Sequence, residues 1–173
     1  VGGLGLSCAD DDGDQVTKTP QTLQGIYAAD RVAMLTAENP QWRGEQKPRL
    51  LVVGAGMMGR EHLRVTQLLG WADVQGIVDP FPDSVSQALA EWRSITDRPL
   101  MVYPDAREAS LDTVVDAIVI CTPNYTHFDV LQSVCVSEKP ILLEKPMATN
   151  LLDAARLVTM GKKYPTFIQL GMQ

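Results

Sequence analysis

A short apolar run that leads directly into a glycine-rich turn is the feature that most constrains the fold of this 173-residue chain. The run is Leu50–Val53, and the turn is Gly54–Gly59 with glycines at positions 54, 56 and 59. A continuous apolar run is typical of a strand buried on both faces of a parallel sheet. The GxGxxG spacing suits a tight turn at Gly54, close approach of the backbone to a pyrophosphate at Gly56, and close packing of helix and strand at Gly59. The sequence therefore predicts a strand, a phosphate-binding turn and a helix in succession.

The helix that follows the turn should begin with free backbone N–H groups and a positive dipole end, both of which favour phosphate. Met57 and Met58 lie at this helix start, so we expect their backbone to contribute to cofactor binding and their side chains to pack. The alternative is a glycine-rich turn that binds nothing.

Asp79 ends the next apolar run, 20 residues beyond Gly59. A carboxylate at this spacing accepts hydrogen bonds from the adenosine ribose hydroxyls and repels a 2′-phosphate, so we expect NAD rather than NADP. Pro80 and Phe81 follow it, and neither is a cation that would hold a 2′-phosphate. One alternative is that Asp79 is a solvated or helix-capping aspartate. Another is that the chain is a methyltransferase, although a methyltransferase loop is usually spaced GxGxG.

Strand and helix patterns alternate along the rest of the chain, which predicts an α/β fold with a doubly wound parallel sheet of six strands. The expected strands are 50–53, 74–78, 100–103, 117–121, 141–143 and 167–170. Helices are expected at 58–69, 83–95, 125–136 and from the Asn150 cap through 162.

Residues 1–48 differ from the rest, with the acidic stretch Asp10–Asp14 and several prolines, and are interpreted as a partly disordered extension. Residues 49–173 form the predicted dinucleotide-binding domain.

Fifteen Lys and Arg against 21 Asp and Glu give a net charge of −6, which argues against nucleic acid and anionic membranes as partners. Three scattered cysteines indicate neither disulfides nor a metal site and favour a reducing, cytoplasmic setting.

Three stretches together resemble the Gfo/Idh/MocA oxidoreductases, the family of glucose–fructose oxidoreductase and inositol dehydrogenase. They are Gly54–Gly59 with His62 three residues on, Cys121–His127, and Glu144-Lys145-Pro146. The resemblance covers residues from about 49 to 173. It implies a Rossmann domain and hydride exchange between NAD and a sugar, polyol or related carbonyl compound.

The resemblance also implies roles for individual residues. Lys145 would be catalytic, since an ammonium beside the reacting oxygen stabilises a developing alkoxide. Glu144 would contact the nicotinamide ribose. The remaining cofactor-binding positions in the loop after the fourth strand are Thr122, Pro123, Asn124 and His127. For His127 a structural role is an open alternative, and His62 is interpreted as a packing or helix-start residue.

Members of this family continue into a second α/β domain that holds the substrate pocket and the usual oligomer contacts. This sequence stops at Gln173, so we expect the substrate domain to be missing from the chain and the parent to be a homo-oligomer. A non-catalytic NAD-binding sensor or regulatory module of the same fold is the alternative, and the intact Lys145 argues for the enzyme.

Overall fold

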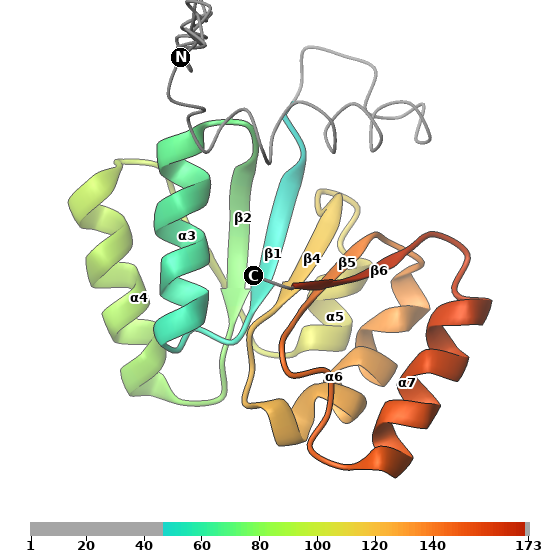
Figure 1. Ribbon diagram of the computed structural model, residues 1–173. Coiled ribbons are helices and arrows are strands. Elements are labelled where there is room, and N and C mark those ends of the chain that lie inside the picture. Colours follow the sequence, from blue (N-terminus) through green and yellow to red (C-terminus); the bar gives the residue numbers. More distant parts are fainter. Residues whose placement is uncertain (1–46, 172–173) are drawn as a thin grey trace, which may run out of the picture.

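The computed structural model describes residues 47–171, and over these residues six parallel strands form one sheet in the order β3-β2-β1-β4-β5-β6 (Figure 1). The extension expected at the N-terminus lies, but for its last two residues, outside the described part of the chain. The strands are β1 (Arg49–Val53), β2 (Asp73–Val78), β3 (Met101–Tyr103), β4 (Ala117–Ile120), β5 (Ile141–Glu144) and β6 (Ile168–Gly171). In this strand order the direction of winding reverses between β1 and β4, as in a Rossmann fold. The predicted doubly wound six-stranded sheet is confirmed.

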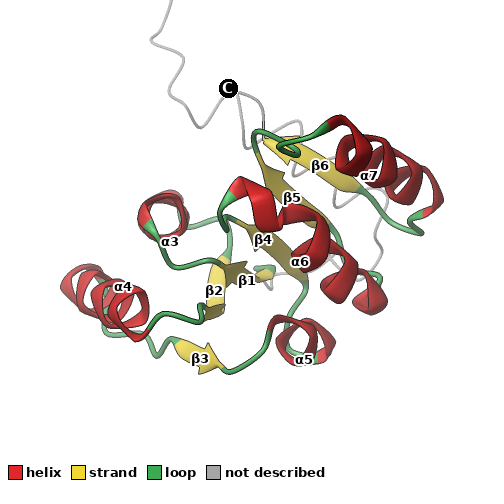
Figure 2. Cartoon of the chain, turned by 90° about the horizontal axis from the view of Figure 1, so that it is seen from below, coloured by secondary structure: helices red, strands yellow, loops and turns green. Residues whose placement is uncertain are grey.

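Helices cover both faces of the sheet. Viewed along the strands, α3 and α4 lie on one side, and α5, α6 and α7 lie on the other (Figure 2). Their bounds are α3 (Met57–Leu69), α4 (Pro82–Ile95), α5 (Ala106–Leu111), α6 (His127–Val134) and α7 (Leu151–Lys163). No helix within residues 47–171 combines the length and the apolar character needed to cross a membrane.

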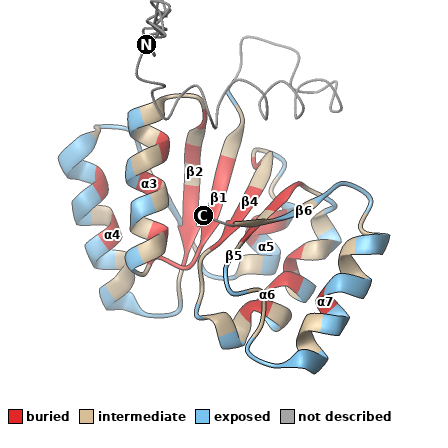
Figure 3. Ribbon diagram, viewed as in Figure 1, coloured by how far each residue is buried: buried red, intermediate tan, exposed pale blue. Residues whose placement is uncertain are grey.

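Two apolar cores hold these layers together, and the alternation of β1 divides its side chains between them. Buried residues, red in Figure 3, lie along the strands and on the helices beside them. Leu50 and Val52 pack with the buried Trp92 of α4 in one core. Leu51 and Val53 pack with residues of the opposite helices, such as Leu131 of α6, in the other. Leu50–Val53 are apolar and buried on both faces of the sheet, which fixes β1 at its centre. The glycine turn follows at the carboxyl end of β1.

Two parts of the helical pattern differ from the sequence-based prediction. The short helix α5 was not predicted, because it has only six residues and a weak apolar period; Asp105 caps it by accepting from the backbone N–H of Glu108 at 2.8 Å. The helix expected at 125–136 is instead α6 flanked by the 3₁₀ turns Asn124–Thr126 and Cys135–Ser137. The first of these turns forms because the N–H of Thr126 reaches back to the carbonyl of Pro123 at 2.8 Å.

Candidate functional site

All the predicted cofactor-binding residues lie on the segments where four neighbouring strands end. β2, β1, β4 and β5 are consecutive in the sheet and run parallel, so their carboxyl ends meet at one edge. Ligands of open parallel sheets bind outside this edge, beside the point where the winding reverses. In Figure 1 this edge is the lower one, from which the chain enters α3, α4, α6 and α7.

The three glycines of the turn meet three different spatial demands. Gly54 has a φ of +98°, and a Cβ there would lie 2.8 Å from the carbonyl carbon of Cys121 and 2.8 Å from the nitrogen of Thr122. A Cβ on Gly59 would overlap the carbonyl oxygen of Gly54. Gly56, in contrast, has nothing within 4 Å of its Cβ position. Gly54 and Gly59 are therefore required by the turn and by helix packing, whereas the bare face of Gly56 is open to a ligand.

The start of α3 fits a pyrophosphate. Gly56 is the N-cap residue of this 13-residue helix, and no side chain caps it and no acidic residue occupies its first turn. The first N–H groups of an α-helix have no partner within the helix, so those of Met57, Met58 and Gly59 point toward the space beside Gly56. Donors and a positive dipole end beside an open backbone surface are what a dinucleotide phosphate requires.

Asp79 is tied to the glycine turn by its own carboxylate. Its Oδ2 accepts from the backbone N–H of Ala55 at 2.7 Å, and its Oδ1 accepts from that of Phe81 at 2.9 Å. The side chain is partly exposed, and each carboxylate oxygen has a second lone pair. Asp79 therefore braces the turn and still has acceptor capacity for ribose hydroxyls.

The segment after β4 places Thr122, Pro123 and Asn124 at the same edge. Pro123 is exposed, and Thr122 and Asn124 are partly exposed. The hydroxyl of Thr126 lies 2.9 Å from that of Thr122 and donates to the carbonyl of Pro123 at 2.7 Å, which closes the turn on itself.

His127 is 1% exposed, and its ring joins the loops that follow β4 and β5. Nδ1 lies 3.0 Å from the carbonyl oxygen of Pro146, and Nε2 lies 3.0 Å from that of Thr122. Both polar atoms of the ring are thus occupied by backbone, and none faces outward to a cofactor. This burial and these two backbone contacts support the structural role that the sequence left open for His127, and a direct contact with the cofactor stays a prediction.

Glu144 and Lys145 lie side by side at the end of β5 but in different environments. Lys145 is exposed, and its peptide bond to Pro146 is cis. The Glu144 side chain is only 14% exposed, and its Oε1 lies 2.8 Å from Nε2 of His62 on α3. His62 therefore contacts the Glu144 side chain directly and is not a mere packing residue. Its place three residues after Gly59 gave no sign of a partner 82 positions away in the sequence.

Cys121 is a partly buried thiol that packs against the core near Glu144. Its burial, with the Glu144 carboxylate nearby, raises the pKa of the thiol far above its ordinary value. A thiol that stays protonated is a poor nucleophile and a poor metal ligand. Within residues 47–171 no three side chains of His, Cys, Asp or Glu are grouped so that they could hold a metal ion.

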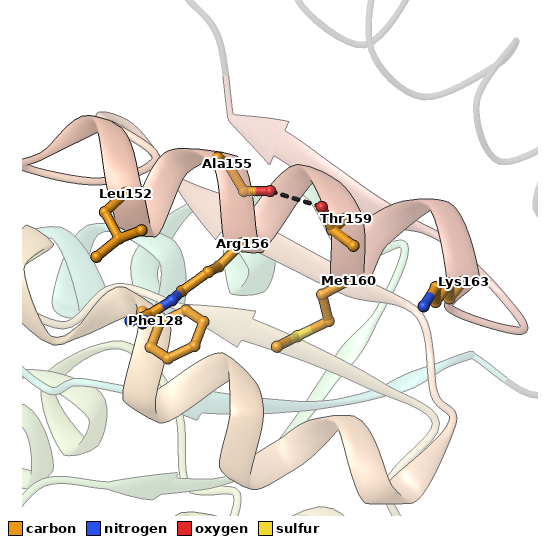
Figure 4. Close-up of a pocket in the computed structure, with 7 residues that line it drawn as sticks. All are labelled: Phe128, Leu152, Ala155, Arg156, Thr159, Met160 and Lys163. Carbon is orange, nitrogen blue, oxygen red and sulfur yellow. Dashed lines mark hydrogen bonds between the residues drawn. The ribbon is translucent and has the colours of Figure 1, made fainter.

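A shallow pocket also lies between α6 and α7, in the helical layer (Figure 4). Its lining is mainly apolar and includes Phe128 and Met160, and the guanidinium of Arg156 stands 5.5 Å from the centre of the Phe128 ring. None of the residues predicted to bind cofactor lines this pocket.

The fold and the glycine turn define a Rossmann-type nucleotide-binding domain. A family model described as "Oxidoreductase family, NAD-binding Rossmann fold", that of the Gfo/Idh/MocA proteins, matches residues 49–172. The chain belongs to this family.

Similar proteins agree with this assignment. The chain is 32% identical over 133 residues to an inositol 2-dehydrogenase of Rhodococcus jostii, and 27% identical over 123 residues to the rhizopine catabolism protein MocA of Rhizobium meliloti. These matches cover 74% and 71% of this chain but only 34% and 37% of the relatives. Among solved structures, myo-inositol dehydrogenase of Lactobacillus casei, in complex with NAD(H) and myo-inositol, matches with a TM-score of 0.65 at 26% identity. That match covers 73% of this chain and 37% of the other.

The chain thus corresponds to the NAD-binding part of longer oxidoreductases. The relatives named here include dehydrogenases, which does not favour the alternative of a sensor or regulatory module.

Proposed function

We propose that this chain is the cofactor domain of an NAD-dependent dehydrogenase that oxidises a hydroxyl group of a sugar or polyol, or reduces the corresponding carbonyl. The observation that carries this proposal is the meeting of three features at one sheet edge. These are the open Gly56 at the start of α3, the Asp79 carboxylate, and the Glu144-Lys145 pair. The substrate class rests on the named relatives, which include inositol dehydrogenases.

The proposed division of labour follows the sheet edge. Gly54, Gly56, Met57, Met58 and Gly59 hold the pyrophosphate, and Asp79 holds the adenosine ribose. The nicotinamide end is positioned by Thr122, Pro123, Asn124 and Glu144. His127 supports them by joining the loops that follow β4 and β5. The Asp79 carboxylate would repel a 2′-phosphate, which favours NAD over NADP.

Lys145 is the proposed catalytic residue. NAD, when bound, would supply the hydride acceptor or donor, and the substrate oxygen would lose or gain a proton in the same transformation. An exposed ammonium at the end of β5 can donate a hydrogen bond to that oxygen and stabilise negative charge as it develops. Substitution of Lys145 should therefore affect the chemical step rather than cofactor affinity.

Further parts of the proposal concern the parent protein. Relatives extend well beyond the matched region, and we infer that the substrate pocket and homo-oligomer contacts belong to such a further domain. Cys121 and Cys135 are free thiols, in keeping with a cytoplasmic protein. We expect neither nucleic acid nor membrane as a partner.

The experiment that tests the proposed function has two steps. Calorimetric titration of the chain with NAD and with NADP tests cofactor binding and choice. Assays of NADH production by the protein that contains this domain, over a panel of inositols and sugars, test the reaction. Absence of NAD binding by the folded chain would contradict the proposal.

A further inference from the structure

The Glu144 carboxylate is held from several sides. Its Oε1 lies 2.8 Å from Nε2 of His62, and its Oε2 accepts from the backbone N–H of Lys145 at 3.2 Å. The backbone of Gly171 on β6 closes a third side, since a Cβ there would lie 3.4 Å from Oε1. A carboxylate accepts hydrogen bonds and cannot donate them, so His62 donates the proton of its Nε2. Little freedom remains for the Glu144 side chain.

This hydrogen bond connects two parts of the site that the chain forms far apart. His62 lies on α3, one turn beyond the phosphate-binding start of that helix, whereas Glu144 ends β5. β4 lies between β1 and β5 in the sheet, so the bond spans the carboxyl end of β4. Cys121, the residue after β4, has its thiol pKa raised in part by the Glu144 charge, which agrees with this placement.

His62 is poorly suited to a purely apolar packing role. Its side chain is 25% exposed, while Leu63, the next residue on the helix, fills the core at 2% exposure. A partly buried carboxylate without a donor is costly, and hydrogen bonds to charged groups are among the stronger ones. His62 thus compensates the burial of Glu144 and determines where its carboxylate points.

We propose that His62 is a positioning residue for the nicotinamide half of the cofactor, acting through Glu144. The His62–Glu144 hydrogen bond makes the helix that receives the pyrophosphate and the strand end that receives the nicotinamide ribose a single rigid unit. This inference rests on the proposed function, because it gives Glu144 a contact with the nicotinamide side of NAD.

The test compares two ligands on the same 173-residue chain by calorimetry. ADP contains the adenosine and pyrophosphate of NAD but lacks the nicotinamide riboside. His62→Leu should weaken NAD binding about ten-fold, the scale of one charge-assisted hydrogen bond, and change ADP binding by less than about two-fold. Glu61→Gln, at an exposed neighbour on the same helix, is the matched control and should change neither affinity.

Two further variants distinguish positioning from general damage. A glutamine at position 62 can place an amide nitrogen near the site of Nε2, whereas an asparagine is too short, so His62→Gln should retain NAD affinity and His62→Asn should lose it. This pair decides the question if His62→Leu fails to fold. In a Glu144→Ala background, His62→Leu should have no additional effect, because the residue through which it acts is gone.

Three outcomes would overturn the inference. They are equal weakening of NAD and ADP, equal behaviour of the Gln and Asn variants, and additive effects of His62→Leu and Glu144→Ala. Failure of the unaltered chain to bind NAD or ADP would instead refute the proposed function, so the two failures are distinguishable.

Discussion

Ala55 donates its backbone N–H to the Asp79 carboxylate at 2.7 Å, so the turn after β1 and the residue after β2 form one structural unit. The N–H of Gly54 strengthens this unit by donating to the carbonyl of Val78 at 2.8 Å. One carboxylate therefore has two tasks, the shape of the phosphate turn and the proposed recognition of the ribose.

The first prediction concerns cofactor choice. The unaltered chain should bind NAD at least about ten-fold more tightly than NADP, a difference of roughly 1.4 kcal/mol. Asp79→Ala should narrow or reverse this preference, because it removes both the ribose acceptor and the charge that repels a 2′-phosphate. Calorimetry with both cofactors measures it, and tighter NADP binding by the unaltered chain would contradict the role of Asp79.

A second prediction contrasts two glycines of one turn. Gly56→Val should abolish detectable NAD binding without lowering the melting temperature, since Gly56 has an ordinary extended backbone and its Cβ position is empty. Gly59→Val should lower the melting temperature sharply, because its side chain would overlap the backbone of Gly54. Differential scanning calorimetry and NAD titration of both variants give the comparison. Unchanged NAD affinity in Gly56→Val would mean that the cofactor binds elsewhere.

The third prediction separates binding from chemistry. Lys145→Met should leave the NAD dissociation constant within about two-fold of the unaltered chain, because Lys145 is exposed and is not among the residues proposed to hold the cofactor. In a longer protein that carries the proposed substrate domain, the same change should lower kcat by about 10²-fold or more, the scale of general acid–base assistance. Titration and steady-state assays measure the two effects. A loss of NAD affinity equal to the loss of rate would assign Lys145 to cofactor binding.

A fourth prediction concerns alkaline stability. Burial raises the pKa of Tyr164 to about 12, and its hydroxyl donates to the carbonyl of Lys139 at 2.6 Å. A group with a raised folded pKa stabilises the fold below its unfolded pKa and loses that contribution as pH rises toward the folded value. The unaltered chain should therefore lose stability relative to Tyr164→Phe as pH rises from about 10 to 12.

Denaturant titrations at several pH values measure this difference. Near neutral pH, Tyr164→Phe should be the less stable protein by about 0.5–1.5 kcal/mol, because the hydrogen bond is missing. A stability gap between the two proteins that does not narrow above pH 10 would contradict the assigned burial of the hydroxyl.

Much of the fold could be predicted because local and global signals agree. β1 and β4 are continuous apolar runs, and Gly70 ends α3 with a φ of 65°, as expected for a glycine at a helix end. The helix α5 escaped prediction because a six-residue segment has too few apolar positions to show a period.

The site could be predicted as a set of residues, because the glycine spacing and the strand ends are visible in the sequence. The partnerships among them could not. His62 contacts Glu144, and His127 contacts backbone oxygens of two loops, only because the fold brings the carboxyl ends of several strands to one edge of the sheet. Two histidines of similar appearance in sequence therefore have different roles, one facing a carboxylate and one buried between carbonyls.

Because β1 lies at the centre of the sheet, cofactor binding depends on the folding of the whole domain. β1 pairs with β2, its near neighbour in sequence, and with β4, which lies more than 60 residues further along the chain. The turn after β1 is closed by contacts with both sides, from Val78 on one and from Cys121 on the other. This turn takes its shape only after β1 and β4 have paired. That pairing brings together segments far apart in the sequence, which is the slow and entropically costly event in folding such a topology. Cofactor affinity and global stability are therefore thermodynamically linked, and NAD should raise the free energy of unfolding of the whole domain, including strands far from the proposed site.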